Sequence, residues 1–505
     1  MLYAYILTVL ILAVLFGLCL KYPATALGTK PRLDLLGPQG LPVLGNLLDI
    51  YPHRLHILSW ITAMGRQYGE LFSWTVPLTG RTIVINRPEW IDHVHKNEGT
   101  IYGKGEVALA VFSQFPGRGS PFSTEGAEWR HSRKVIKPVF EARNLAIGVS
   151  EIMEEMMTLA HGLLHYAAKR DVTIDFNELC GRLVLAIFCK LALSLDMPLL
   201  TDASCLSEPH VIVENLHVLN TISSGRLPNP FWTITEKLDG RERRFKAARQ
   251  QLFKVIEDII KSRQDASDNG GTHRDFLSTL LEEEDTTDLD LMRDELVSLL
   301  FAGRDTTQNA LIWSLHELSR SPAWFDKMRE EAQMNALPPN HAADPCTRLQ
   351  NYPIHLAVLY ETLRLWPGVP KNGRSALRDD VLPAIPDRGY DPIRVGKGNF
   401  VAWSDWDMMK GEAIWGPDAK VFNPARHLDA ERRFVKPPSP KFHAFGAGPR
   451  LCPGVQLASY EFVAIWANLL PSFDFVAEVK ERYPTDALTI TMREPFIVKA
   501  IPWSG

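Results

Sequence analysis

Cys452 is the residue of this chain whose surroundings are best suited to chemistry. It lies in the run Phe445-Gly446-Ala447-Gly448-Pro449-Arg450-Leu451-Cys452-Pro453-Gly454, whose glycines allow positive φ and the close approach of a flat ligand. An apolar, helix-compatible stretch follows from Val455 to Leu470, so we expect the sulfur at a helix N-terminus, where an anion is favoured. With the Arg450 charge nearby, this placement predicts a lowered thiol pKa and a thiolate presented to a metal. The alternative is a buried structural cysteine in a glycine-rich turn.

The pattern around Cys452 also carries a resemblance. The order Phe-Gly-x-Gly-x-Arg-x-Cys-x-Gly, continued by Ala458 and Glu461, resembles the haem-binding signature of the cytochrome P450 family. The resemblance implies that Cys452 is the axial ligand of haem b (iron protoporphyrin IX), that Phe445 shields its sulfur, and that Arg450 binds the cofactor. A single thiolate ligand favours O–O bond cleavage at a haem iron.

Further residues match the positions that hold haem propionates in that family. Trp129 and Arg133 have the Trp-x-x-x-Arg form, and Arg374 matches another propionate-binding position. Arginine suits this task because its planar fork pairs with a carboxylate through two hydrogen bonds. His443 is either a further propionate contact or an ordinary surface residue, and the sequence leaves both open.

A second motif, Ala302-Gly303-Arg304-Asp305-Thr306-Thr307, lies in an apolar-periodic stretch from about residue 290 to 319 that predicts one long helix. Glycine and β-branched residues are poor helix formers. The motif is therefore either a kink, in which Thr306 bonds back to a carbonyl, or a groove over the haem. The resemblance implies the groove, with Asp305 and Thr306 delivering protons to dioxygen. Ala302, Thr306 and Val369 are the candidate substrate-pocket residues.

Glu361-Thr362-Leu363-Arg364 has the family's Glu-x-x-Arg form, and its i,i+3 spacing places both charges on one helix face. Most such pairs are solvated surface contacts, but the apolar flanks indicate burial, and a buried pair needs further partners. By resemblance Arg426 is the third member of an ionic triad. We interpret the triad as structural.

The N-terminus predicts a membrane anchor. Residues 2–20 contain no charged side chain. An uncharged stretch of this length is long enough to span a bilayer as a helix. Basic residues follow the span and none precedes it, so the rest of the chain is expected in the cytosol. A cleaved signal peptide is the alternative. We assign residues 1–21 to the transmembrane anchor, 22–46 to a basic and proline-rich linker and hinge, and 47–505 to the haem-thiolate monooxygenase domain.

The expected fold class is mainly α with a small β region, a cytochrome P450 fold with a single large haem domain after the N-terminal transmembrane helix. Amphipathic stretches predict helices near residues 152–168, 176–193 and 241–263, and strands are expected at 71–76 and 82–85. Residues 103–119 are expected to form a loop that caps the substrate pocket. The net charge of −4 gives no indication of a nucleic-acid partner, and the six scattered cysteines suit a reducing compartment.

The resemblance implies a monooxygenase that acts on a lipophilic substrate with electrons from NADPH. No dinucleotide-binding segment is evident, so the electrons must come from a separate partner. The resemblance implies that this partner is NADPH–cytochrome P450 reductase, with cytochrome b5 as a further candidate. Lys134, Lys137 and Lys441 are candidate docking contacts on the cysteine side. The expected location is the endoplasmic reticulum membrane, single-pass, with a cytosolic catalytic domain.

Substrate and reaction class leave alternatives. The motif residues look most like the fungal branch that hydroxylates alkanes and fatty acids, whose members also serve secondary metabolite biosynthesis. Gly373 and the approach Ala444-Phe445-Gly446 depart from that branch, which argues against a simple fatty-acid substrate. The rival functions are an oxygen-independent haem-thiolate isomerase or dehydratase, and a non-catalytic haem or lipid carrier. The presence of both Asp305 and Thr306 favours the monooxygenase.

Overall fold

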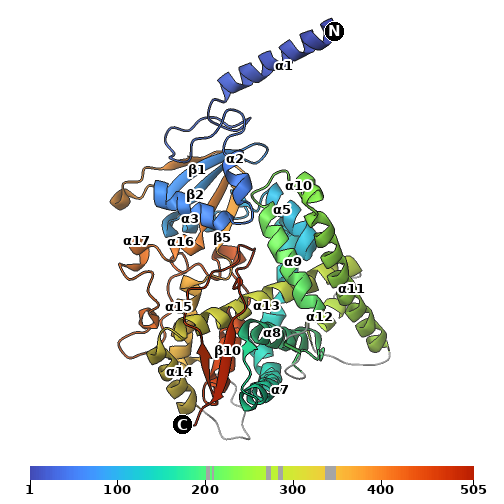
Figure 1. Ribbon diagram of the computed structural model, residues 1–505, viewed down its shortest axis with the longest axis vertical. Helices are drawn as coiled ribbons and strands as arrows, with labels where there is room; N and C mark the ends of the chain where they lie inside the picture. Colours follow the sequence, from blue (N-terminus) through green and yellow to red (C-terminus); the bar gives the residue numbers. More distant parts are fainter. Residues whose placement is uncertain are drawn as a thin grey trace.

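The computed structural model describes residues 1–504 except 141, 201–204, 207–209, 269–274, 283–287 and 336–347. Helices dominate it, and the strands form small sheets, one of which lies beside the anchor helix (Figure 1). The helices are α1 (Leu2–Lys21), α2 (Leu47–Ile50), α3 (Ile57–Tyr68), α4 (Pro88–Lys96), α5 (Glu106–Phe112), α6 (Gly126–Ile136), α7 (Ala142–Lys169), α8 (Phe176–Leu193), α9 (Val211–Arg226), α10 (Trp232–Asp239), α11 (Arg241–Asp268), α12 (Phe276–Glu282), α13 (Leu289–Leu318), α14 (Pro322–Met334), α15 (Pro353–Leu365), α16 (Asp405–Met408), α17 (Glu412–Trp415) and α18 (Val455–Leu469).

The largest sheet joins segments from the two ends of the chain. Its strand order is β1 (Leu71–Val76), β2 (Gly80–Ile85), β8 (Phe400–Ser404), β5 (Lys371–Ala376) and β3 (Tyr102–Gly103). All neighbours are antiparallel except β2 and β8, which run parallel. A second sheet has the order β4 (Ile174–Asp175), β10 (Ile497–Pro502), β9 (Phe473–Ala477), and β6 (Asp380–Leu382) pairs with β7 (Ile393–Val395).

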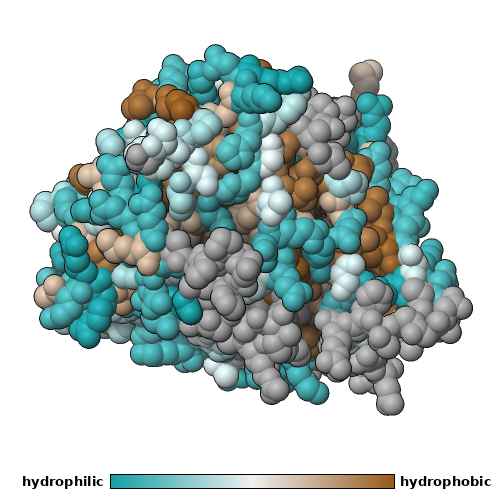
Figure 2. Space-filling model, turned by 90° about the horizontal axis from the view of Figure 1, so that it is seen from below, coloured by the Kyte–Doolittle hydropathy of each residue, from teal (hydrophilic) through white to brown (hydrophobic). Residues whose placement is uncertain are grey.

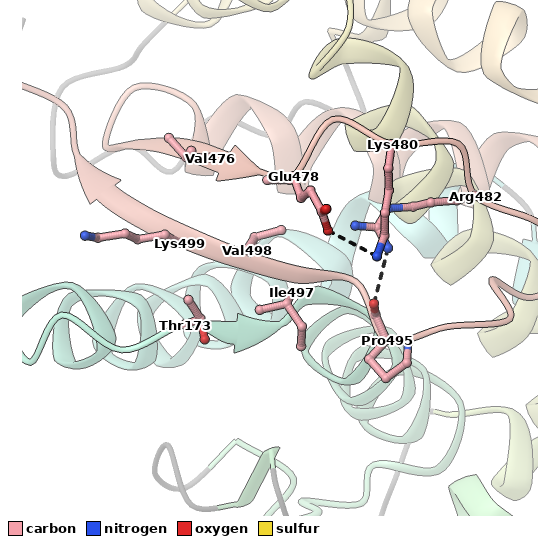
Figure 3. A pocket seen from close by; sticks show the side chains of 10 residues that line it. Thr173, Val476, Glu478, Lys480, Arg482, Pro495, Ile497, Val498 and Lys499 are labelled. Atoms are coloured by element: carbon pink, nitrogen blue, oxygen red, sulfur yellow. Dashed lines mark hydrogen bonds and ion pairs between the residues drawn. The ribbon is translucent and has the colours of Figure 1, made fainter.

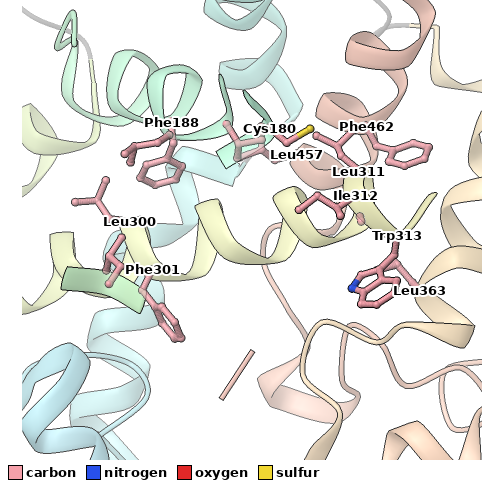
Figure 4. Close-up of a cluster of buried hydrophobic side chains, with 14 of the residues drawn as sticks. Cys180, Phe188, Leu300, Phe301, Leu311, Ile312, Trp313, Leu363, Leu457 and Phe462 are labelled. Atoms are coloured by element: carbon pink, nitrogen blue, oxygen red, sulfur yellow. The ribbon is translucent and has the colours of Figure 1, made fainter. Parts of the chain in front are cut away.

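Helix α13 crosses the middle of the body (Figure 1). It begins at an N-cap, because the Asp288 carboxylate accepts a hydrogen bond from the Asp290 amide at 2.8 Å. Apolar side chains surround its second half, and the Trp313 ring stacks on Trp366 with centroids 3.7 Å apart (Figure 4). Most of its side chains, polar ones included, are buried, so α13 is a core helix against which other helices pack.

Gly303 has a packing role that the sequence did not indicate. A Cβ at this position would lie 2.6 Å from the Phe188 ring, so the glycine lets α8 pack closely against α13. This contact offsets the cost of a glycine in a helix interior. The predicted long helix is confirmed to within a residue at each end.

Residues 22–46 are hydrogen-bonded to the large sheet and do not form a free linker between α1 and the body. The Ser73 amide donates to the Leu36 carbonyl at 2.8 Å, and the Asn46 amide donates to the Thr75 carbonyl at 2.7 Å. Gly37 fits only without a side chain, since a Cβ there would lie 1.9 Å from the Ser73 carbonyl oxygen. We call this segment the strap.

Helix α1 projects away from the body, and none of its side chains is buried (Figure 1). Its length and composition would let it cross a membrane, and no other helix in the described ranges passes that test. The face of the body on the side away from α1 is mainly hydrophilic, with apolar side chains confined to small patches (Figure 2). The structure is therefore consistent with one apolar helix ahead of a water-exposed body.

The segment 103–119 is not the loop that the sequence predicts. It contains α5 and the helical turn η2 (Ser113–Gly117), and Phe115 of that turn contacts Phe301 of α13 with ring centroids 5.0 Å apart. Alanine and leucine between Gly105 and Ser113 favour a helix, and the glycines mark only its ends. The segment still lies over α13, but as helical structure.

Candidate active site

Cys452 lies between the helical turn η8 (Gly448–Arg450) and the start of α18. Its amide donates to the Phe445 carbonyl at 2.9 Å, which closes the turn. Gly446 and Gly448 have φ values of 73° and 64°, and a Cβ on Gly448 would lie 3.0 Å from the His95 Cβ. The turn conformation and the contact with α4 therefore both require glycine.

The electrostatics of the thiol differ from the sequence prediction. Burial raises the pKa of Cys452, and the Gly454 amide and the Arg133 charge do not outweigh that effect. Arg450, which was expected beside the sulfur, instead directs its Nε toward Glu98 Oε1 at 3.0 Å. The predicted lowering of the thiol pKa is wrong for the protein chain by itself. A metal ion that binds here would have to displace the proton.

Charged side chains converge beside the cysteine turn, and we call Glu98, Lys104, Arg374 and Arg450 the Glu98 cluster. Glu98 Oε1 accepts from Arg374 Nε at 2.8 Å and lies 3.0 Å from Arg450 Nε. Burial tends to raise the pKa of Glu98, but the hydrogen bond from His95 and the Arg374 charge outweigh it and hold the pKa at about 2. This carboxylate is therefore ionised and shared by two guanidinium groups.

Lys104 is a member of the Glu98 cluster that sequence reasoning missed. Its Nζ donates to the Phe122 carbonyl at 2.5 Å, and its amide donates to Glu125 Oε1 at 2.5 Å. Burial lowers the pKa of Lys104 well below its usual value, and the charges of Arg450 and Arg374 lower it further. In the protein chain by itself, this environment therefore disfavours the positive charge on Lys104. The only signal in the sequence was a lysine between two glycines.

The predicted Trp129 and Arg133 border the same place. The Trp129 ring lies 4.5 Å from the Arg450 guanidinium carbon, and Arg133 Nη2 donates to the Leu451 carbonyl at 2.5 Å. The structure therefore brings Trp129, Arg133, Arg374 and Arg450 around the turn that carries Cys452. A cation-rich cluster with too few carboxylates suits a ligand that brings its own, as the two propionates of a haem would. The donor set fits a haem.

His443 is not a surface residue. It is 3% exposed, and its Nε2 lies 2.8 Å from Nε2 of His95. Phe445, expected to shield the sulfur, is half-buried and packs at 6.0 Å from Tyr360, measured between ring centroids.

On α13, the Thr306 hydroxyl donates to the Ala302 carbonyl at 2.8 Å. That is the back-bond of the kink alternative, and it leaves the hydroxyl oxygen free to accept a proton. The neighbouring Asp305 is 1% exposed, and its carboxylate accepts from Arg304 at 2.6 Å. Its other oxygen accepts from Asn220 of α9 and from the Thr489 hydroxyl, each at 3.1 Å. The last two partners were missed because they come from distant segments.

Two of the pocket candidates, Ala302 and Thr306, lie one turn apart on α13, and the third, Val369, belongs to the segment after α15. A Cβ on Gly368, next to Val369, would lie 3.6 Å from Thr306 Cγ2, so the segment after α15 passes close to α13. The Ile490 amide donates to the Gly368 carbonyl at 3.0 Å, which brings the C-terminal region to the same place. Ala302 and Val369 are both partly exposed. The structure thus assembles three distant segments around Thr306.

The structure brings Glu361, Arg364 and Arg426 together. Glu361 and Arg364 form two parallel hydrogen bonds of 2.8 Å, and Arg426 Nε donates to Glu361 Oε1 at 3.3 Å. His427 is a fourth partner that sequence reasoning missed, with Nε2 3.1 Å from Glu361 Oε2. We call these four residues the Glu361 cluster. Glu361 and Arg364 are fully buried.

A separate shallow pocket lies on the second sheet, where β9 and β10 meet β4 (Figure 3). Its cations have partners: Lys480 pairs with Glu478 at 3.1 Å, and the Arg482 side chain donates to the Pro495 carbonyl at 3.3 Å. None of the predicted site residues lines it. We assign it no role in the chemistry.

Comparison with known proteins agrees with this geometry. The family model described as Cytochrome P450 matches residues 35–499. The chain is 31% identical to a cytochrome P450 monooxygenase, cyp1, of Mycosarcoma maydis, over 95% of this chain and 77% of that protein. It is 28% identical to cytochrome P450 94B3 of Arabidopsis thaliana over 95% and 94% of the two chains. It is 27% identical to cytochrome P450 94A1 of Vicia sativa over 87% and 85%.

Proposed function

Because the chain belongs to the cytochrome P450 family of monooxygenases, we propose that it inserts one oxygen atom of O2 into a C–H bond of a lipophilic substrate, at a haem held by Cys452. The observation that carries this proposal is the position of Cys452 at the start of α18 beside the cation-rich Glu98 cluster. A cysteine thiolate is one of the axial ligands that haem iron takes, and arginine side chains suit the carboxylates of its propionates.

The residues that would hold the haem follow from this placement. Cys452 would bind the iron, and Phe445 would cover the sulfur. Trp129, Arg133, Arg374 and Arg450 would bind the propionates. When bound, the haem supplies the oxidising chemistry, and the protein supplies orientation and protons.

The proton-transfer residues in this proposal are Asp305 and Thr306. The Thr306 hydroxyl is fixed by its bond to Ala302, so its oxygen points to one place and can accept or pass on a proton there. Asp305 is buried but tied to Arg304, Asn220 and Thr489. A carboxylate with three partners keeps one position, and at least one of these bonds must loosen before it exchanges a proton with water.

The substrate is lipophilic in this proposal because apolar side chains lie close to Thr306 in the fold. Phe115 of η2 meets Phe301 of α13 in an edge-to-face contact, and the segment that carries Val369 passes close to Thr306. Fatty-acid-like or alkane-like compounds and secondary metabolite intermediates are the substrate classes we propose. Apolar lining with few polar groups is the usual character of such pockets.

We further propose an endoplasmic reticulum membrane location, with α1 as the anchor and NADPH–cytochrome P450 reductase as the electron donor. Lys134, in α6, is exposed one residue after Arg133, which contacts the cysteine turn. Lys441 is a weaker docking contact than the sequence suggested, because its Nζ lies 4.4 Å from the Trp415 ring and burial lowers its pKa.

The proposal is tested on the full chain in microsomes with the reductase. We expect a thiolate-type carbon monoxide difference spectrum, and NADPH-dependent O2 consumption with a lipophilic substrate. Cys452→Ser should abolish the spectrum, whereas Cys205→Ser, a change at another buried cysteine, should leave it intact. A screen of fatty acids, terpenoids and polyketides by spectral shift would define the substrate class.

Two results would redirect the proposal. A normal spectrum without O2 consumption, together with turnover of a lipid peroxide, would identify an isomerase or dehydratase. A normal spectrum with neither activity would identify a carrier. If O2-dependent turnover is observed, Thr306→Ala should reduce it by about 10²-fold or more, because Thr306 is proposed to transfer protons.

A further inference from the structure

Two buried histidines from opposite ends of the sequence meet behind the Glu98 cluster. Nε2 of His95, in α4, lies 2.8 Å from Nε2 of His443, and the rings are 5.0 Å apart between centroids. Each side chain belongs to a residue that is 3% exposed. Trp403 of β8 packs edge-on against both rings and excludes water from them. Two imidazole nitrogens at this separation must share a hydrogen, because two lone pairs would repel.

A carboxylate lies at each end of the histidine pair. Nδ1 of His443 is 2.9 Å from Oδ1 of Asp405, and Nδ1 of His95 is 3.2 Å from Oε2 of Glu98. The His95 ring bonds to Glu98 through Nδ1, whereas His443 Nδ1 and Asp405 Oδ1 are close but not aligned as a hydrogen bond. The His95 Nδ1 that faces the Glu98 carboxylate therefore carries a hydrogen, and a further hydrogen lies between the two Nε2 atoms.

The other end of this chain of contacts reaches the residues proposed to hold the haem. Glu98 uses Oε2 for His95, and Oε1 for Arg374 and Arg450. The position of its carboxylate therefore sets the position of both guanidinium groups. Asp405 is itself fixed, because its Oδ2 accepts from Asn372 of β5 at 2.7 Å.

We propose that His95 and His443 share one proton and act together as positioning residues, which hold the Glu98 carboxylate so that Arg374 and Arg450 are aligned for the haem propionates. This inference rests on the proposed haem site. The charged groups that face the pair are Asp405 from α16, Glu98 after α4, Arg374 from β5 and Arg450 from η8.

A shared proton has a consequence in acid. A second proton on the pair would place two N–H groups face to face, and the Nε2 contact would break. Burial lowers the pKa of His95, as do the charges of His443 and Arg374, so this event is displaced below the usual histidine range. Acidification should thus break the contact between His95 and His443. Glu98 would then position Arg374 and Arg450 less firmly.

The test measures how fast the haem leaves the full-length holoenzyme, by transfer to excess apomyoglobin, from about pH 7.5 to about pH 4.5, which extends below the usual histidine range. The variants are His95→Gln, His443→Gln and the double variant, because glutamine keeps a donor and an acceptor but cannot titrate. His93→Gln is the matched control. His93 lies on the same helix and faces Asp380 at 2.9 Å, but it is outside the pair.

We expect the wild type and His93→Gln to lose haem about tenfold faster at the acid end, the size typical of residues that orient a metal site. Each single variant should lose haem about as fast as the double variant, since one broken contact disrupts the chain. Their rates should vary little with pH. Unfolding temperature, measured in parallel, reports whether each variant is folded.

Additive effects of the two single variants, or a haem-loss rate of the wild type that is flat with pH, would overturn the proposal. The same holds if the double variant keeps the wild-type pH dependence. Failure of the full chain to bind haem at all would instead refute the proposed function. The two failures are therefore distinguishable in one preparation.

Discussion

The Glu361 and Glu98 clusters contain the same kinds of side chain but differ in their balance of charge. In each, one buried glutamate is shared by two arginines and one histidine. The remaining donors of Arg364 end on backbone carbonyls of Met409, Ala419 and Val421. Around Glu98, by contrast, burial and the charges of Arg450 and Arg374 lower the pKa of Lys104, so its positive charge is disfavoured until a ligand brings negative charge. We therefore expect the Glu361 cluster to serve the fold and the Glu98 cluster to be completed by a ligand.

Glu361→Ala should give the largest effect on stability. It would leave the two arginines without their buried carboxylate, which costs about 3–5 kcal/mol in the free energy of unfolding. Urea unfolding measures this loss. Glu412→Ala, which removes an exposed glutamate paired with Lys420, is the control and should change stability by less than about 0.5 kcal/mol. A loss below about 1 kcal/mol for Glu361→Ala would show that the cluster does not serve the fold.

Glu98→Gln should lower stability less, and in a pH-dependent way. The pKa of Glu98 is about 2 in the folded protein and 4.5 as an ordinary side chain, so its stabilisation is complete above pH 4.5 and is lost as the pH falls toward 2. The expected difference from wild type is on the order of 3 kcal/mol at neutral pH. Urea midpoints measured from about pH 7 to about pH 3.5 should converge below pH 4.5. A difference that stays constant over this range would contradict the low pKa of Glu98.

Lys104→Met should change the rate of haem loss and not the free energy of unfolding, which distinguishes the Glu98 cluster from the Glu361 cluster. It removes a cation that we expect to face the propionates, so haem should leave about tenfold faster. The free energy of unfolding should change little, because the lysine is not a partner of Glu361. Lys420→Met, at an exposed pair, is the control. An unchanged rate of haem loss would mean that Lys104 does not contribute to haem binding.

His427→Asn should have the smallest effect. It removes one hydrogen bond to Glu361 and should cost roughly 0.5–1.5 kcal/mol in unfolding free energy, with haem loss unchanged. His95→Gln is its counterpart at the other glutamate and should alter haem loss. If His427→Asn accelerated haem loss as much, the distinction between the two clusters would fail.

Local patterns in the sequence predicted the long elements well. The apolar period from residue 290 to 319 became α13, and the expected helix at 176–193 matches α8 at both ends. Glu361 and Arg364 could be paired because their spacing places them on one helix face. The helix α5 was missed, since flanking glycines were taken as the sign of a loop.

The contacts that complete the site were not accessible from local patterns. His95 and His443 are separated by 348 positions, and Asn220 meets Asp305 across 85. The periodicity of the sequence cannot predict such pairs, because they depend on how distant segments such as β5, β8 and the cysteine turn pack together. The family resemblance supplied Arg426, but it did not supply Glu98, Lys104 or His427.

The strap has a mechanical consequence. Because its backbone is hydrogen-bonded to β1 at Ser73 and Thr75, a pull on α1 is borne first by the large sheet and not by α13. In the proposed membrane-bound protein, movement of α1 would therefore be transmitted through the strap to β1. A truncation that stops at Lys21 keeps the hydrogen bonds between the strap and β1, whereas one that continues past Gly37 removes the bond between Leu36 and Ser73.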